Sequence, residues 1–129
     1  MKIRAETVFC DDVRLENTGK HILIGVYGSD IVPGVMPANL GISLWTRVYG
    51  LAKGKHHFHM VLSGPTGRSK FEATGDTDIT SSDAPAVFAM AGLPVEVPSA
   101  GEITVTYAFD GGPTIEAGKI RVLAPPQAG

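Results

Sequence analysis

Apolar and polar residues alternate with a period of two along most of the chain, and glycine or proline residues separate the alternating segments. A period of two places successive side chains on opposite faces of a strand. The pattern therefore predicts an all-β fold, an antiparallel β-sandwich of about eight short strands. The expected strands are 4–10, 21–27, 41–49, 56–63, 68–75, 86–92, 102–110 and 114–123. We expect one domain over residues 1–123, followed by a short tail over 124–129.

The second of these segments, 21–27, departs from simple alternation because nearly all of its residues are apolar. A continuous apolar run is typical of a strand that is buried on both faces. The sequence therefore predicts a central strand there. Residues 28–39 are expected to form a loop, and residues 76–85 a polar connection.

A tight turn at Gly64-Pro65-Thr66-Gly67 predicts the register of one hairpin. Proline in the second position suits a type I turn. Pairing Ser63 with Arg68 keeps apolar residues on one face, and a slip of one residue would invert the faces. This register sets Met60 opposite Phe71, Phe58 opposite Ala73 and His59 opposite Glu72.

A second hairpin is expected around Gly111-Gly112, a pair that readily takes the positive φ angles of a type I′ turn. Pairing Asp110 with Pro113 places Ile103 opposite Ile120. The two registers and the alternation together predict a core that includes Ile24, Val26, Leu44, Phe58, Met60, Phe71, Ile103, Val105 and Ile120.

Composition narrows the classes of function. The formal net charge is −2, too near neutral for a general affinity for nucleic acid. Cys10 is the single cysteine, so no intramolecular disulfide can form. No stretch approaches the ~20 apolar residues of a membrane span, and charges at Lys2 and Arg4 do not suit a signal peptide. We therefore expect a cytoplasmic protein without a nucleic-acid or membrane partner.

Two resemblances extend this picture. The segments Phe9–Lys20 and Leu23–Ile31, with Pro65-Thr66-Gly67 and Gly92-Leu93-Pro94, resemble a family of small bacterial proteins known only as a domain of unknown function. That resemblance implies a β-sandwich made in bacteria or their phages, and it implies no activity and no catalytic residues. The segment 98–105 and the hairpin after it resemble the C-terminal end of bacterial immunoglobulin-like sandwiches, which usually carry tyrosine where this chain has Ile103.

The densest cluster of reactive side chains is Lys55-His56-His57-Phe58-His59. His57 and His59 lie two apart on the expected strand and share a face, as paired histidines do in strand-based metal sites. Glu72 is the candidate third ligand, and the three residues form the alternative hypothesis of a metal-binding protein or small metal-dependent enzyme. We prefer the simpler interpretation, a solvated face on which His59 pairs with Glu72, because only two ligands are securely brought together.

The loop 31–37 carries apolar residues where polar ones are expected, at Ile31, Val32, Val35 and Met36. They either cover one end of the sandwich or form a contact surface for a partner. The segment Thr7–Cys10 has no proline or lysine, so an edge strand there would lack protection against pairing.

These observations predict a non-enzymatic interaction module that requires no cofactor. We expect it to bind a protein partner or a further copy of itself as a homo-oligomer, within a bacterial or phage assembly. A sandwich that binds a carbohydrate or another ligand is a third hypothesis, for which Trp45 and Tyr49 are the available aromatic residues.

Overall fold

The computed structural model describes residues 2–126 of the 129-residue chain. Within these residues there are nine strands and no helix, so no membrane-spanning helix is found in the described part. The strands are β1 (Arg4–Leu15), β2 (His21–Val26), β3 (Asp30–Ile31), β4 (Ala38–Tyr49), β5 (Gly54–Ser63), β6 (Lys70–Ile79), β7 (Ala86–Val97), β8 (Gly101–Phe109) and β9 (Ile115–Val122). The predicted all-β class is confirmed.

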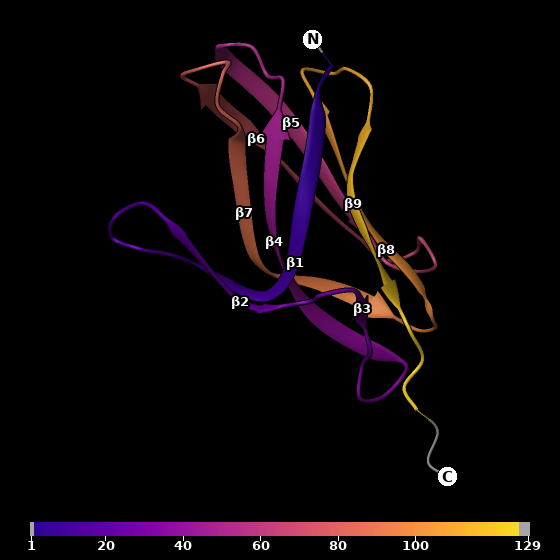
Figure 1. Cartoon of the computed structure of the whole chain (residues 1–129). Coiled ribbons are helices and arrows are strands. Elements are labelled where there is room, and N and C mark those ends of the chain that lie inside the picture. Colours follow the sequence, from indigo (N-terminus) through magenta and orange to yellow (C-terminus); the bar gives the residue numbers. More distant parts are fainter. Residues whose placement is uncertain (1, 127–129) are drawn as a thin grey trace.

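The strands form two sheets that pack as the layers of a sandwich (Figure 1). One sheet has four strands in the order β2-β1-β4-β7, and the other has five in the order β3-β9-β8-β5-β6. The strand pairs are antiparallel with one exception, because the two residues of β3 run parallel to β9. This short strand lies inside the expected loop 28–39, which is why the count exceeds the prediction by one.

The core lies between the two sheets, and alternation along each strand directs side chains into it. Along β4, Leu44 and Val48 are buried while Trp45 and Tyr49 lie on the outer face. Four aromatic rings form one cluster in this core, with Phe58 and Phe88 edge to face at 5.0 Å and Tyr107 stacked on Phe109 at 5.8 Å. Such pairs add to the stabilisation that burial alone provides.

The β5–β6 hairpin contains the expected turn but closes two residues later than predicted. Gly67 N–H donates to Gly64 O at 3.0 Å, as a type I turn requires, and Gly64 N–H donates to Ser69 O at 2.8 Å. Ser63 therefore pairs with Lys70, and Met60 lies opposite Ala73. A shift of two residues preserves the faces, so Met60 stays in the core although its predicted partner was wrong.

The β8–β9 hairpin has the predicted pairing of Ile103 with Ile120. Its turn lies one residue earlier than expected, because the positive φ angles belong to Asp110 (55°) and Gly111 (71°). A register shift next to Val105 compensates for the earlier turn and restores the predicted pairing further along the strands.

The predicted core is correct for Leu44, Met60, Ile103, Val105 and Ile120, all of which are buried. Phe58 and Phe71 are half-buried and pack against the core. Ile24 and Val26 were placed in the core wrongly, because their side chains are 42% and 53% exposed.

The error has a topological cause, since β2 lies at the edge of the four-stranded sheet and pairs with β1 alone among the described residues. Thr7–Cys10 is likewise not the free edge that we expected, because these residues pair with β4. Two strands are also longer than predicted: β1 continues to Leu15, and β6 continues to Ile79 into the expected connection 76–85. Of the expected tail 124–129, residues 124–126 carry no strand, and residues 127–129 lie outside the described part.

Candidate functional site

The three histidines of β5 each bond a carboxylate, and the carboxylates differ. His57 Nδ1 lies 3.0 Å from Asp76 Oδ1, and His59 Nε2 lies 3.1 Å from Glu72 Oε1. The predicted His59–Glu72 pair is therefore present. It is a diagonal contact across the β5–β6 ladder, because the residue directly opposite His59 is Thr74.

His56 points to the opposite face of β5, as its position in the strand predicts. Its Nδ1 lies 2.6 Å from Asp110 Oδ2, and its Nε2 lies 2.6 Å from the carbonyl oxygen of Ala52. The bond to the Ala52 carbonyl and the bond to Asp110 raise the pKa of His56. The His56 imidazole and the backbone N–H of His57 hold the pKa of Asp110 below its usual value. The pair thus joins the start of β5 to the β8–β9 turn.

The hypothesis of a metal site needed His57, His59 and Glu72 to converge. The structure brings His59 and Glu72 together but directs His57 to Asp76 instead. In residues 2–126 no group of three or more His, Cys, Asp or Glu side chains is gathered closely enough to hold a metal ion. Each histidine of β5 therefore contacts its own carboxylate, and Asp76 is shared between His57 and Lys55. Exposed contacts such as those of His57 and His59 are worth little.

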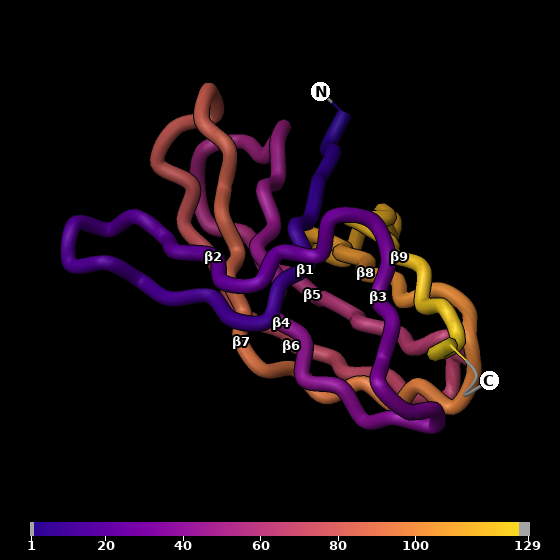
Figure 2. The backbone as a smooth tube through the Cα atoms, turned by 60° about the horizontal axis from the view of Figure 1, so that its bottom comes forward, coloured from indigo at the N-terminus to yellow at the C-terminus, as the bar shows by residue number. Residues whose placement is uncertain are grey.

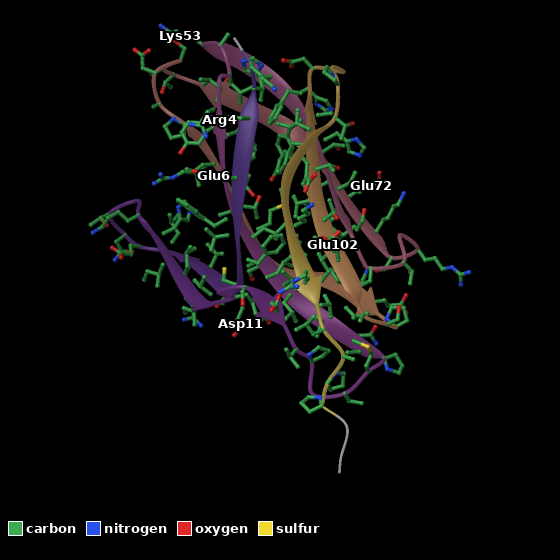
Figure 3. The ribbon with its side chains drawn as sticks, turned by 45° about the vertical axis from the view of Figure 1, so that its right-hand side comes forward. Arg4, Glu6, Asp11, Lys53, Glu72 and Glu102 are labelled. Atoms are coloured by element: carbon green, nitrogen blue, oxygen red, sulfur yellow. The ribbon has the colours of Figure 1, made fainter. Side chains whose placement is uncertain are left out.

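The outer face of the four-stranded sheet carries aromatic rings that are already covered. The Arg4 guanidinium lies 4.1 Å from the centre of the Tyr49 ring, and the Arg47 guanidinium lies 4.8 Å from the centre of the Trp45 ring. The Tyr49 hydroxyl donates to Glu6 Oε1 at 3.0 Å, and Figure 3 shows Arg4 and Glu6 along β1. Cation–π contacts of this kind occupy the ring faces on which a sugar would stack.

The structure divides the apolar loop 31–37 into two parts. Ile31 is buried and pairs with Val122 in β9, and Met36 packs against the core. Val32 and Val35 are exposed, at 52% and 67%. Half of the predicted contact residues therefore cover the end of the sandwich, and the other half face solvent.

A larger apolar surface was missed by the sequence analysis. The β1–β2 hairpin, residues 11–26, extends the edge of the four-stranded sheet beyond the rest of the sandwich in Figure 1 and again in the turned view of Figure 2, and we call it the arm. Large apolar side chains are exposed along it, at Leu15, Ile22, Ile24 and Val26. Within residues 2–126, each strand of the arm forms ladder pairs with the other strand of the arm alone.

Both faces of the arm carry apolar residues. One face presents Ile22 and Ile24 beside Arg14 and Asp12, which form an ion pair at 3.0 Å. The other face pairs Val13 with Leu23. A cavity of about 260 Å³ lies between the arm and β7, and it is lined by Val13, Arg14, Leu15, His21, Ala89 and Ala91.

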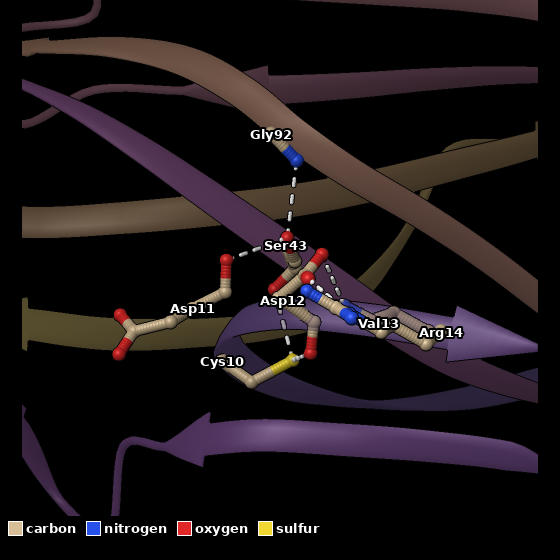
Figure 4. A network of polar contacts seen from close by, with 7 residues as sticks. All are labelled: Cys10, Asp11, Asp12, Val13, Arg14, Ser43 and Gly92. Atoms are coloured by element: carbon tan, nitrogen blue, oxygen red, sulfur yellow. Dashed lines mark hydrogen bonds and ion pairs between the residues drawn. The ribbon is translucent and has the colours of Figure 1, made fainter.

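A polar network anchors the base of the arm (Figure 4). Ser43 Oγ donates to Asp11 O and accepts from Gly92 N–H, both at 3.0 Å. Cys10 is fully buried beside it, with Sγ 3.4 Å from Asp12 O. Burial and the charge of Asp11 raise the pKa of the Cys10 thiol, so this cysteine is a packing residue rather than a nucleophile.

The choice of which opposite residues are hydrogen-bonded to each other differs between the base and the tip of the hairpin, and it changes at Gly25. Tyr27 N–H donates to Phe9 O near the sandwich, and Glu16 N–H donates to Lys20 O at the tip. In a regular antiparallel ladder bonded pairs recur every two residues, yet these two pairs are seven residues apart. Gly25 lies between the two pairs, and its φ of +67° rotates the backbone so that the bonding pattern can change there.

Comparison with known proteins identifies a family. Residues 6–122 match the family of unknown function DUF6941, and the chain belongs to that family. No curated protein sequence matches the chain.

Proposed function

We propose that this member of a family of unknown function is a non-enzymatic protein-interaction module and that the arm is its contact surface. The observation that carries the proposal is the exposure of Leu15, Ile22, Ile24 and Val26 on a hairpin that extends beyond the sandwich. Burying apolar surface is favourable by roughly 25 cal/mol per Å², so such side chains gain most by contact with another protein.

The edge of β2 strengthens the proposal. Natural edge strands are usually protected by lysine, proline or a covering segment. From Ile22 to Val26 this strand contains no charged residue and no proline, and within residues 2–126 it pairs on one side alone. Its free edge can therefore accept a further strand by β-augmentation.

The exposed residues Val32 and Val35 form a smaller second surface that supports the same proposal. Each histidine of β5 contacts one carboxylate, as in His59–Glu72, and within residues 2–126 no three His, Cys, Asp or Glu side chains gather as metal binding requires. This arrangement favours a binding role over an enzymatic one.

The proposal also covers where the protein acts, its origin and the type of sandwich. We place the protein in the cytoplasm of a bacterium or in a phage-derived assembly, where a lone buried cysteine suits a reducing compartment. The family resemblance of the N-terminal third supports the bacterial origin. The β8–β9 end supports an immunoglobulin-like arrangement of the sandwich.

Site-specific photocrosslinking tests the contact surface. A benzophenone amino acid is introduced at Ile22 in cells of the organism that encodes the chain, with Thr74 on the outer face of β6 as the matched exposed control. We expect ultraviolet light to give a discrete protein adduct from position 22 and none from position 74. Adducts equal at both positions, or absent from both, would contradict the proposal.

A further inference from the structure

The free edge of β2 has a defined pattern of unpaired backbone groups. Glu16 and Lys20 form a bonded pair at the tip of the arm, so the next bonded pairs towards its base are Arg14 with Ile22 and Asp12 with Ile24. The N–H and C=O groups of His21 and Leu23 consequently point away from β1. They are the groups that an added strand would bind.

This pattern is complementary to itself. If a second copy approaches with its β2 antiparallel and the two-fold axis at Ile22, His21 of each copy lies opposite Leu23 of the other. Two bonded pairs then use the free groups of both copies. We propose that the arm pairs with the arm of a second copy in this register, an inference that rests on the proposed function and names its partner.

The side chains agree with the register. The two Ile22 side chains meet at the axis, in a non-bonded pair where Cβ atoms approach to about 4.5–5.5 Å. On the other face, Leu23 of one copy lies beside His21 of the second, next to its exposed Leu15. The exposed apolar residues of the two arms thus form one continuous cluster on each face.

Charge is also complementary across the joined arms. Lys20 of the second copy lies opposite Ile24, on the face that carries Asp12, and two strand spacings separate the Lys20 and Asp12 backbones by about 10 Å. A lysine side chain spans most of that distance. Within one copy Lys20 lies 3.8 Å from Glu16 and Asp12 lies 3.0 Å from Arg14, so each attraction across the axis adds to an existing ion pair. The symmetric arrangement places no like charges directly opposite each other.

The length of the pairing limits its strength. A contact of two short edge strands buries less than the ~1,200–2,000 Å² of a stable interface. The dimer is therefore weak and should form only at high protein concentration. Its dissociation constant is expected between about 10 µM and about 1 mM.

Sedimentation of the purified full chain tests the pairing. Wild type should approach the mass of a dimer as its concentration rises. Ile22→Lys, which sets two positive charges against each other at the axis, should weaken association at least tenfold. Thr74→Lys adds the same charge at an exposed site on the outer face of β6 and should leave association unchanged.

A cysteine variant tests the register. Ile22→Cys should form an intermolecular disulfide rapidly at a protein concentration near the dissociation constant, and Thr74→Cys should not. A wild-type chain that stays monomeric to about 1 mM, or equal disulfide yields from the two variants, overturns the inference. A monomeric chain that still gives an adduct of another protein from position 22 in cells would refute self-pairing while leaving the proposed function intact.

Discussion

Gly25 of β2 faces the carboxylate of Asp11 across the base of the arm. A Cβ atom at position 25 would lie 2.8 Å from Asp11 Cγ, and the φ angle of Gly25 is +67°. Asp11 Oδ1 in turn accepts a hydrogen bond from the Tyr27 hydroxyl at 3.0 Å. The close approach and the backbone angle both require glycine where the arm leaves the sheet.

Replacing this glycine should loosen the arm without unfolding the sandwich. Gly25→Ala forces an alanine into the left-handed region and displaces Asp11 from Tyr27, at a cost of about 1–2 kcal/mol. Hydrogen exchange of the arm amides should accelerate roughly 5–30-fold. Core amides such as that of Ile103, which exchange through global unfolding, should stay well protected and accelerate by no more than the same factor. Gly19→Ala at the arm tip, where a Cβ meets no atom within 4 Å, is the control for a positive φ angle alone. Unaltered arm exchange in Gly25→Ala would show that the base is not constrained.

Phe58 joins β5 to the aromatic cluster through its edge-to-face contact with Phe88. Phe58→Ala leaves a cavity at a half-buried site, so the free energy of unfolding should fall by about 3 kcal/mol, the low end of the range for buried phenylalanine. Chemical denaturation measures the change. His59→Ala, one residue along on the outer face, should change it by no more than about 0.5 kcal/mol. Equal effects of the two variants would mean that the faces of β5 are reversed.

The His56–Asp110 pair should make stability depend on pH in two directions. The raised pKa of His56 gives a stabilisation that is complete below its unfolded value of 6.5 and is lost as pH rises through the folded value. The lowered pKa of Asp110 gives a stabilisation that is present above 3.8 and is lost as pH falls through the folded value. The pair therefore contributes most between pH 3.8 and pH 6.5.

Nuclear magnetic resonance titration of the His56 ring measures this directly. Wild type should titrate above pH 6.5, and Asp110→Asn should lower the pKa of His56 because one of its two bonds loses its charge. The Ala52 carbonyl bond remains in that variant and should keep part of the shift. A His56 pKa that is the same in both proteins would show that Asp110 does not raise it.

The two halves of the loop 31–37 should respond differently to a charge. Met36→Asp introduces a carboxylate among core side chains and should destabilise the fold by at least ~2 kcal/mol. Val35→Asp alters an exposed side chain and should change stability by less than about 0.5 kcal/mol. Thermal unfolding of the two variants makes the comparison, and a neutral Met36→Asp would place Met36 on the surface.

Sequence reasoning succeeded where local chemistry decides the structure. Alternation and the turn residues around Gly67 and Gly111 were sufficient to place every strand of residues 2–126 except β3, to assign the buried faces of β4 and β8, and to pair Ile103 with Ile120. A shift of two residues keeps every side chain on the same face of its strand. Pairing Met60 with Phe71, as predicted, or with Ala73, as observed, therefore gives an equally apolar face, and alternation cannot distinguish the two registers.

The arm could not be predicted for a physical reason. An apolar run such as residues 21–27 has the same composition whether it is buried at the centre of a sheet or exposed at an edge. Only the topology, in which β1 lies between β2 and β4, decides that Ile24 is exposed. The one local signal was Gly25 within an apolar strand, which is typical of a bulge or a close approach of the backbone.

The central claim is that the free edge of β2 binds another strand, and that in the purified protein this strand is the β2 of a second copy. Hydrogen exchange of the His21 and Leu23 amides, measured from about 1 µM to about 1 mM protein, tests it most directly. We predict that exchange at these two amides slows as the concentration rises, while the amide of Ser82, in the exposed connection between β6 and β7, exchanges at a constant rate. Exchange at His21 and Leu23 that is as fast in the concentrated protein as in the dilute protein would contradict the claim.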